Sequence, residues 1–437
     1  MANVLPFQGI QYNPEFIGNF GDVTTPPYDV ISDKQRDDFY EHHPNNIIRL
    51  ILGKPSPADT EKDNPHTRAA ACYRKWLAEG IFVRRKTPAL YLSAVDFSAE
   101  GQGFTRYGLI AQVGLEPFEK KIILPHERTF SKVKSERLEL MKVCRANFSP
   151  IFSLYMDGGG ILTRLIGAAD QTPPEMNFID SEGHRHRLWR LTDENLHGLV
   201  KNSFSDKQLF IADGHHRYET ALNYRDWLKQ TDPNFDQNHP ANYIMMYLCS
   251  MNDPGMRILP AHRLLSGISD QIRAELLAKA KTDFDITAFT QSKKGREALL
   301  AQLETPNRTC CIGLCLKGHD QFYLLSLKPG VMQRRFGAEL PDAMRKLDVT
   351  VLTHLILMHL LGYSLKELDN PHLITYNSRS AEAIAEVTSG SQDVAFIMRP
   401  TKIEQVQQVA KEGLIMPRKS TYFYPKVITG QVLNDLT

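Results

Sequence analysis

The sequence gathers chemically active side chains at one predicted strand-to-helix turn. An apolar run, residues 208–212, leads directly into Asp213 and Gly214, and a helix-like pattern follows. Glycine permits a sharp turn and lets a ligand approach the backbone, while the first N–H groups of a helix favour an anion. The carboxylate of Asp213 beside such a site suits a Mg²⁺ ligand or a base that orients a hydroxyl. The donors that open the helix are His215, His216 and Arg217.

We therefore expect this turn to bind phosphate, with Asp213 as catalytic residue and metal ligand and His215 as a second catalytic residue. Gly214, His216 and Arg217 are then expected to hold the phosphates. The alternative is that the histidines and the arginine only cap neighbouring carbonyl groups. The number of polar residues at this one turn favours the functional interpretation.

A second candidate is the rigid turn near the start of the chain. Two adjacent prolines precede Tyr28 and Asp29. Because proline fixes the backbone, it would hold Asp29 in place as a metal ligand or a base, and we expect a catalytic role for this residue. The alternative is an ordinary turn in which Asp29 caps the next segment.

Two cationic segments are further candidates for nucleotide contacts. One precedes a helix-like pattern, and its alternative is an ordinary charged helix flank. The other is a loop between two prolines that would close over an anion. The aromatic residues 422–424 beside it would either stack on a base or pack the tail onto the core. Arginine suits bidentate phosphate contacts. The first segment comprises His126, Glu127 and Arg128, and the second comprises Arg418, Lys419, Ser420 and Thr421.

Other patterns in the sequence favour structural roles. His184 and His186 lie in what we expect to be an exposed strand or turn. The six cysteines form no Cys-x-x-Cys pair, so we expect buried small apolar residues in a reduced compartment. The nucleotide and hydrolase motifs Gly-x4-Gly-Lys-Ser/Thr, Gly-x-Gly-x-x-Gly, Gly-x-Ser-x-Gly and His-Glu-x-x-His do not occur.

Composition narrows the class of protein. Hydrophobic residues make up 42% and charged residues 23% of the 437 residues, which excludes a disordered chain, a collagen and a simple coiled coil. The 52 basic and 50 acidic residues nearly balance, which argues against DNA as the main partner. We see no signal-peptide pattern and expect a cytoplasmic protein. Residues 347–361 are too short for a membrane span and are expected to form a buried helix.

Strand-like and helix-like patterns alternate irregularly, so we expect an α+β fold with mixed sheets and flanking helices. The clearest expected hairpin joins residues 309–316 to 321–327, with Cys311 and Cys315 on one face. A helix is expected to follow Thr401 as its N-cap and to end at Gly413. We expect an N-terminal α+β region (1–200), a central segment (201–290) and a C-terminal α+β region (291–437); the alternative is that the three pack as one unit.

The sequence resembles the uncharacterised DUF1015 family. The segment that carries most of the resemblance is Ile211-Ala-Asp-Gly-His-His-Arg-Tyr-Glu-Thr-Ala221. Further segments that fit the family lie at residues 26–32, 46–50, 126–129, 147–152, 258–263 and 416–426. Together they span nearly the whole chain.

A second resemblance is local. Asp213-Gly-His-His-Arg217 is similar to the strand-turn-helix box of the ParB/sulfiredoxin superfamily. In the free-serine kinases of that group, which use ATP or ADP, the box binds phosphate and metal, which would map to Asp213, Gly214, His215 and Arg217. The partition protein ParB binds CTP instead. Sulfiredoxin carries a catalytic cysteine in its box, whereas no cysteine occurs here between Cys144 and Cys249.

These resemblances and the polar turn together imply a function. We expect a nucleotide-dependent phosphotransferase acting on a small hydroxyl metabolite, with free serine as the leading acceptor. Its cofactors would be ATP or ADP, or CTP, with Mg²⁺. One alternative is a ParB-like nucleotide switch that contacts DNA or a partner protein. Another is a nucleotide or phosphoester hydrolase, in which water replaces the hydroxyl acceptor. The oligomeric state is not indicated.

Overall fold

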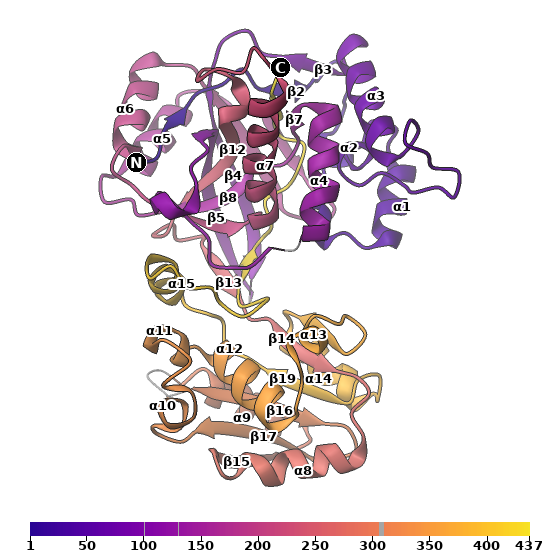
Figure 1. Ribbon diagram of the computed structural model, residues 1–437, viewed down its shortest axis with the longest axis vertical. Coiled ribbons are helices and arrows are strands. Elements are labelled where there is room, and N and C mark those ends of the chain that lie inside the picture. Colours follow the sequence, from indigo (N-terminus) through magenta and orange to yellow (C-terminus); the bar gives the residue numbers. More distant parts are fainter. Residues whose placement is uncertain (100, 130, 306–309) are drawn as a thin grey trace. The chain divides into compact units, whose positions relative to one another are not determined.

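The computed structural model describes residues 1–99, 101–129, 131–305 and 310–437. The chain forms two compact units: the first comprises Met1–Met256 and Pro425–Thr437, and the second comprises Arg257–Tyr424. The expected central segment, 201–290, thus has residues in both units. Sheets and helices intermix in each unit, which confirms the mixed α+β class (Figure 1).

The first unit is built on a mixed sheet of nine strands among the described residues. Parallel pairs join β6 to β11 and β8 to β12, and the other pairs are antiparallel. β1 (Val4–Leu5) pairs with β5 beside the main path. The strand order is β6 (Ile123–Leu124), β11 (Leu209–Asp213), β8 (Ile151–Tyr155), β12 (Tyr243–Ser250), β5 (Gln102–Gly114), β4 (Leu90–Ala99), β10 (Arg185–Leu191) and β9 (Met176–Ile179).

Helices and short pairs of strands surround this sheet. Two of the helices, α4 and α7, lie side by side (Figure 1). The helices are α1 (Asp33–His42), α2 (Ile48–Ile51), α3 (Pro65–Ala78), α4 (Ser131–Cys144), α5 (Ile161–Ala169), α6 (Glu194–Phe204) and α7 (His215–Thr231), with 3-10 turns η1 (Phe20–Asp22), η2 (Tyr28–Val30), η3 (Phe118–Lys120) and η4 (Pro240–Asn242). The small pairs are β2 (Ile10–Tyr12) with β3 (Phe82–Arg84), and β7 (Ala146–Asn147) with β21 (Asn434–Asp435).

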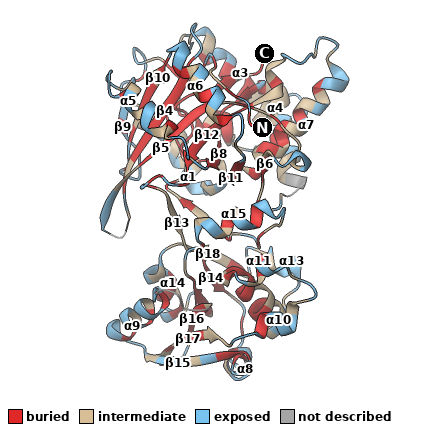
Figure 2. Ribbon diagram, turned by 90° about the vertical axis from the view of Figure 1, so that its left-hand side faces the viewer, coloured by how far each residue is buried: buried red, intermediate tan, exposed pale blue. Residues whose placement is uncertain are grey.

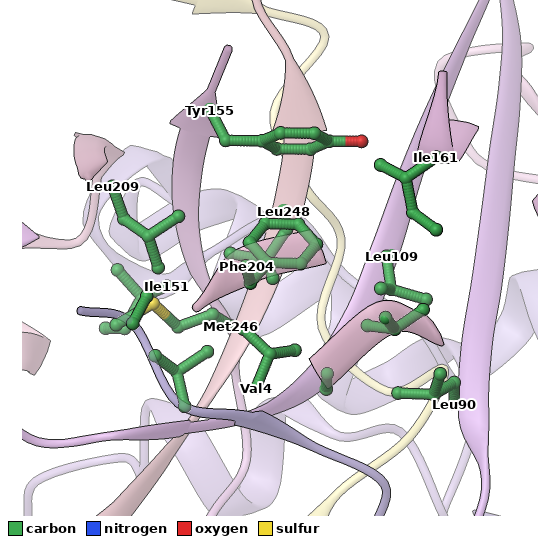
Figure 3. Close-up of a cluster of buried hydrophobic side chains, with 14 of the residues drawn as sticks. Val4, Leu90, Leu109, Ile151, Tyr155, Ile161, Phe204, Leu209, Met246 and Leu248 are labelled. Carbon is green, nitrogen blue, oxygen red and sulfur yellow. The ribbon is translucent and has the colours of Figure 1, made fainter. Parts of the chain in front are cut away.

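Alternation along the strands gives the sheet two different faces. On one face, Leu90, Leu109 and Leu248 pack with Phe204 of α6 and with other apolar side chains (Figure 3). Full burial of a side chain such as Phe204 contributes about 1.5–3 kcal/mol. On the other face, polar side chains bind the C-terminal segment, as Ser93 Oγ donates to Gln431 Oε1 at 3.1 Å. The last residues of the chain are thereby fixed against the sheet.

The second unit has a six-stranded antiparallel sheet with helices around it. Three adjacent strands in the middle of this sheet are buried, whereas its two edge strands are mostly half-buried or exposed (Figure 2). The strand order is β15 (Phe284–Thr290), β17 (Gln321–Leu327), β16 (Cys311–Leu316), β19 (Val394–Ile397), β14 (His262–Leu265) and β18 (Ile374–Asn377), and β13 (Arg257–Leu259) pairs separately with β20 (Tyr422–Tyr424). The helices are α8 (Asp270–Ala280), α9 (Lys293–Leu303), α10 (Val331–Phe336), α11 (Asp342–Arg345), α12 (Asp348–Thr350), α13 (Leu365–Leu368), α14 (Ser380–Thr388) and α15 (Ile403–Lys411).

Several local expectations can be compared with this unit. The β16–β17 hairpin is confirmed, with Cys311 and Cys315 buried in one cluster, although residue 309 lies outside the described residues. The apolar stretch forms α12 and a buried π-helix, Val351–Leu360. The expected N-cap is wrong: Thr401 Oγ1 donates to the carbonyl of Ser420 at 2.6 Å, and α15 begins one residue later than expected, at Ile403, with Lys402 as its N-cap. No helix among the described residues has the length and apolarity that crossing a bilayer requires.

Candidate functional site

The turn between β11 and α7 has the geometry that the sequence predicts. Asp213 ends β11, Gly214 adopts a φ of 94°, and α7 begins at His215. The pairing of β11 with β8 shifts register between Ile211 and Asp213. Such irregularities re-aim side chains next to functional sites. The start of α7 and the carboxylate of Asp213 therefore face the same region. The first backbone amides of α7 have no hydrogen-bond acceptor within the helix.

Asp213 is held between two permanent cations. Its Oδ1 accepts from Lys426 Nζ and its Oδ2 from Arg217 Nη2, both at 2.7 Å. Burial would raise the pKa of Asp213, but the charges of Lys426 and Arg217 outweigh it and hold the pKa well below its ordinary value. Asp213 is therefore a carboxylate anion with both oxygens occupied.

A Mg²⁺ ion bound directly by Asp213 would compete with two ion pairs. A hard cation needs carboxylate oxygens that are available to it, and here each oxygen already carries a cationic partner. The three side chains together have a net charge of about +1, so the turn suits an additional anion better than an additional cation. The expected metal role of Asp213 stays a prediction that would require its partners to move.

Gly214 is required for this arrangement. A Cβ at this position would lie 3.0 Å from Cζ of Arg217, because the guanidinium folds over the turn. Nη1 of Arg217 also donates to the carbonyl of Pro150 at 2.5 Å. Because Gly214 has no side chain, Arg217 can fold over the turn and bind both Asp213 of β11 and Pro150, which precedes β8.

His215 and His126 form a buried pair. Because β6 runs parallel to β11, the residues that follow the two strands meet at one edge of the sheet. The backbone N–H of His126 donates to Nε2 of His215 at 3.2 Å, which places the proton of a neutral His215 on Nδ1. Burial lowers the pKa of His126 to about 4 and that of His215 well below its ordinary value. Both imidazoles are neutral near pH 7, so His215 positions the turn without contributing charge.

The N-terminal segment reaches the same region through Tyr28. Arg137 of α4 stacks over the Tyr28 ring, 4.3 Å from its centroid. Tyr28, Arg137 and Arg217 line a cavity of about 60 Å³ with apolar neighbours. Burial and the charge of Asp29 raise the pKa of Tyr28 to about 12, against the charges of Arg217 and Arg137. Asp29 itself is exposed in η2, and no described residue forms an ion pair with it.

The other predicted residues fall into two groups. Glu127 and Arg128 follow His126, and Arg128 is exposed. The remaining four belong to the second unit, where they form a turn. Arg263 Nη2 binds the carbonyls of Arg418 and Lys419 at 3.2 and 3.0 Å, and Nη1 of Arg418 pairs with Asp369 at 3.0 Å. Ser420 and Thr421 are buried, and the hydroxyl of Ser420 binds the carbonyl of Pro417.

Lys426 and Tyr28 lie in candidate segments of the sequence, but sequence reasoning did not assign them to this site. Lys426 lies 213 residues from its partner Asp213. It is brought there because the C-terminal segment pairs with the N-terminal one, with Thr25 and Thr429 exchanging backbone hydrogen bonds. Lys426 follows the aromatic residues 422–424 in the sequence, but nothing in the sequence indicated that it pairs with Asp213. Tyr28 was visible as the aromatic residue beside Asp29.

The comparisons with known proteins agree with the family resemblance. The family model described as a protein of unknown function, DUF1015, matches residues 4–350. No curated protein matches the sequence.

The solved structures that resemble the chain are distant. A free serine kinase in complex with AMP is 12% identical, with 75% of this chain and 91% of that chain covered and a TM-score of 0.35. A conserved hypothetical protein from Pyrococcus furiosus is 13% identical, with 75% and 97% covered and a TM-score of 0.35. SbnI from Staphylococcus aureus, truncated at its C-terminus, is 12% identical, with 74% and 86% covered and a TM-score of 0.35.

At these TM-scores the three structures support no functional conclusion for this chain. The family model, in contrast, covers well over half of the sequence, including the β11–α7 turn and the residues that follow β6. The chain belongs to the DUF1015 family.

Proposed function

We propose that this protein is a phosphotransferase that holds the phosphates of a nucleotide at the β11–α7 turn and transfers one to a small hydroxyl metabolite, with free serine as the first acceptor to test. The observation that carries the proposal is the placement of Arg217 and Lys426 around Asp213 at the start of a helix. The local likeness of this turn to the box of the free-serine kinases supports the same function.

The charge balance explains how the turn would receive a phosphate. Asp213 keeps the two cations in position and partly neutralises them before the nucleotide binds. The oxygens of an arriving phosphate would accept hydrogen bonds from Arg217, from Lys426 and from the first amides of α7. Phosphoryl transfer depends mostly on such positioning and charge stabilisation. Gly214 lets the phosphate approach the backbone, and His216, half-buried at the second position of α7, would add a donor.

The transfer itself needs an acceptor for one proton. The substrate hydroxyl oxygen would form a bond to the terminal phosphorus, while the bond from that phosphorus to the nucleotide oxygen breaks. Asp29 is the residue we propose to accept the hydroxyl proton, because it is exposed, unlike Asp213, and its charge acts on the same Tyr28. Glu127 and Arg128 stay proposed nucleotide contacts at this turn, and the nucleotide-binding role that the sequence predicts for Arg418, Lys419, Ser420 and Thr421 stays a prediction for the second unit taken by itself.

The experiment is a product assay with the full chain. ATP, ADP and CTP are each incubated with serine, with and without Mg²⁺, and phosphoserine is measured by mass spectrometry alongside inorganic phosphate. We expect phosphoserine from the wild type and a loss of about 100-fold or more in kcat/KM for Asp213→Asn and Asp29→Asn. Lys229→Met, an exposed change on the same helix, is the control.

Two results would contradict the proposal. One is the absence of phosphorylated product across a panel of nucleotides and small hydroxyl acceptors. The other is full activity in Asp213→Asn. Release of inorganic phosphate without phosphoserine would instead indicate that water is the acceptor, and the protein would then be a hydrolase.

A further inference from the structure

A second polar cluster lies in the first unit, in the hairpin between β9 and β10. Asp180, His184 and His186 form the one group of three or more histidine, cysteine or acidic residues, within the part of the chain that the structure describes, whose ligand atoms all lie within 4.8 Å of one another. His186 lies in β10, and His184 is the residue immediately before this strand. Nothing in the proposed phosphotransferase reaction uses them.

The backbone of the turn orients the carboxylate of Asp180. Its Oδ1 accepts from the amides of Glu182 and His184, both at 2.9 Å. Its Oδ2 is thereby directed at the two imidazoles, at 2.8 Å from Nε2 of His186 and 3.4 Å from Nδ1 of His184. Burial would raise the pKa of Asp180, but the hydrogen bonds from both histidines hold it well below its ordinary value.

Aromatic packing fixes the two imidazole rings. The ring of His186 stacks on Phe178 with 5.3 Å between centroids, and the ring of His184 meets the edge of Phe97 at 6.3 Å. Both histidines are buried, at 6% and 3% exposure for His184 and His186. The three ligand atoms are therefore arranged before any ligand arrives, which reduces the entropy cost of binding.

We propose that Asp180, His184 and His186 bind a divalent transition-metal ion, with Zn²⁺ as the ion to test. Zinc bonds to histidine nitrogen and carboxylate oxygen are about 2.0–2.2 Å long, so neighbouring ligands of a tetrahedral site lie about 3.3 Å apart. The two distances to Oδ2 of Asp180, 2.8 and 3.4 Å, lie on either side of this value. Imidazole donors also select against Mg²⁺ and Ca²⁺, which prefer oxygen ligands.

The fourth position would be taken by water or by Glu182. The Glu182 carboxylate lies 3.8 Å from Nδ1 of His184 and is exposed, so it can turn toward an ion at the mouth of the cluster. The ion would tie the turn between β9 and β10 to the face of the sheet.

The test measures metal binding to the full chain after chelator treatment. Zn²⁺ is titrated against a chromogenic competitor, and Co²⁺ is added separately to record the absorption bands of a tetrahedral site. We expect one ion per chain, and affinity at least about tenfold lower in Asp180→Asn and His186→Gln. Asp180→Asn keeps an oxygen for the two backbone amides, so its fold, checked by circular dichroism, should survive even where His186→Gln does not fold.

The matched control is His42→Gln. His42 also pairs with a carboxylate, Asp22, at 3.0 Å, but as an exposed pair outside the three-residue cluster. This variant should bind Zn²⁺ as the wild type does. Wild-type protein without stoichiometric binding, or equal affinity in Asp180→Asn, would overturn the proposal. Neither result bears on nucleotide binding at Asp213.

Discussion

Asp213 and Asp180 are two largely buried carboxylates of the same unit with opposite neighbours. Each lies at or just after the end of a strand, and each has a lowered pKa although burial alone would raise it. Asp213 lies between two cationic side chains, Lys426 and Arg217. Asp180 faces two imidazoles, whose nitrogen atoms are potential metal ligands. The first arrangement suits an additional anion, and the second suits the metal ion that we propose for it.

Removing one cation from Asp213 should produce the largest effect. We expect Lys426→Met to lower the free energy of unfolding by about 3 kcal/mol, because it leaves a buried carboxylate with one partner fewer. Asp180→Asn, which keeps the backbone hydrogen bonds, should cost only about 1 kcal/mol. Urea unfolding checks both values, with Lys229→Met as an exposed control at under about 1 kcal/mol. Equal losses in Lys426→Met and Lys229→Met would show that the ion pair contributes little.

Protonation of His126 and protonation of Asp180 should lower the stability of the fold in different pH ranges. His126, beside Asp213, has a folded pKa of about 4, below the ordinary value of 6.5. Between these values only the unfolded chain binds the proton, so stability should fall by about 3 kcal/mol as the pH drops from 6.5 to 4. The folded pKa of Asp180 is also lowered. Its contribution is therefore present above the unfolded value of about 3.9 and is lost below it.

Two variants separate these windows. His126→Phe should reduce the decline between pH 6.5 and 4, to which His215 also contributes, and Asp180→Asn should reduce only the decline below about pH 4, to which Asp213 also contributes. Unfolding free energies measured across the pH range supply the test. A wild-type stability that stays constant from pH 6.5 to 4 would mean that His126 is protonated in the folded protein.

Replacing the glycines of the two turns should lower the free energy of unfolding by a smaller amount than the changes above. Both have positive φ, 94° for Gly214 and 83° for Gly183. A Cβ at Gly183 meets nothing within 4 Å, whereas a Cβ at Gly214 lies 3.0 Å from the Arg217 guanidinium. Gly183→Ala should therefore cost about 1 kcal/mol from the backbone alone, and Gly214→Ala about 1 kcal/mol more. Thermal unfolding of the two variants compares them directly, and equal costs would place Arg217 away from the turn.

The parts of this site that the sequence predicted are local. The apolar strand, the glycine and the polar helix start are adjacent in the chain, so their pattern alone predicted the β11–α7 turn. The hairpin of β16 and β17 was predicted for the same reason. The mixed α+β class followed from several such segments together.

The unpredicted parts depend on contacts between distant segments. Lys426 reaches Asp213 only because the C-terminal segment crosses the sheet and pairs with residue 25. His184 and His186 were expected in an exposed strand or turn, but both are buried, with aromatic packing and the turn at Asp180 around them. Neither the strand order nor these packing partners can be read from local spacing.

The most direct test of the central claim is nucleotide binding measured by titration calorimetry. ATP and ADP are titrated into wild-type protein, Arg217→Met and Asp180→Asn, each shown to be folded by circular dichroism. We predict binding by the wild type, an affinity at least about tenfold lower in Arg217→Met because a charged hydrogen-bond donor is lost, and no change in Asp180→Asn. Equal affinities in the wild type and Arg217→Met, or no binding by the wild type, would contradict the account.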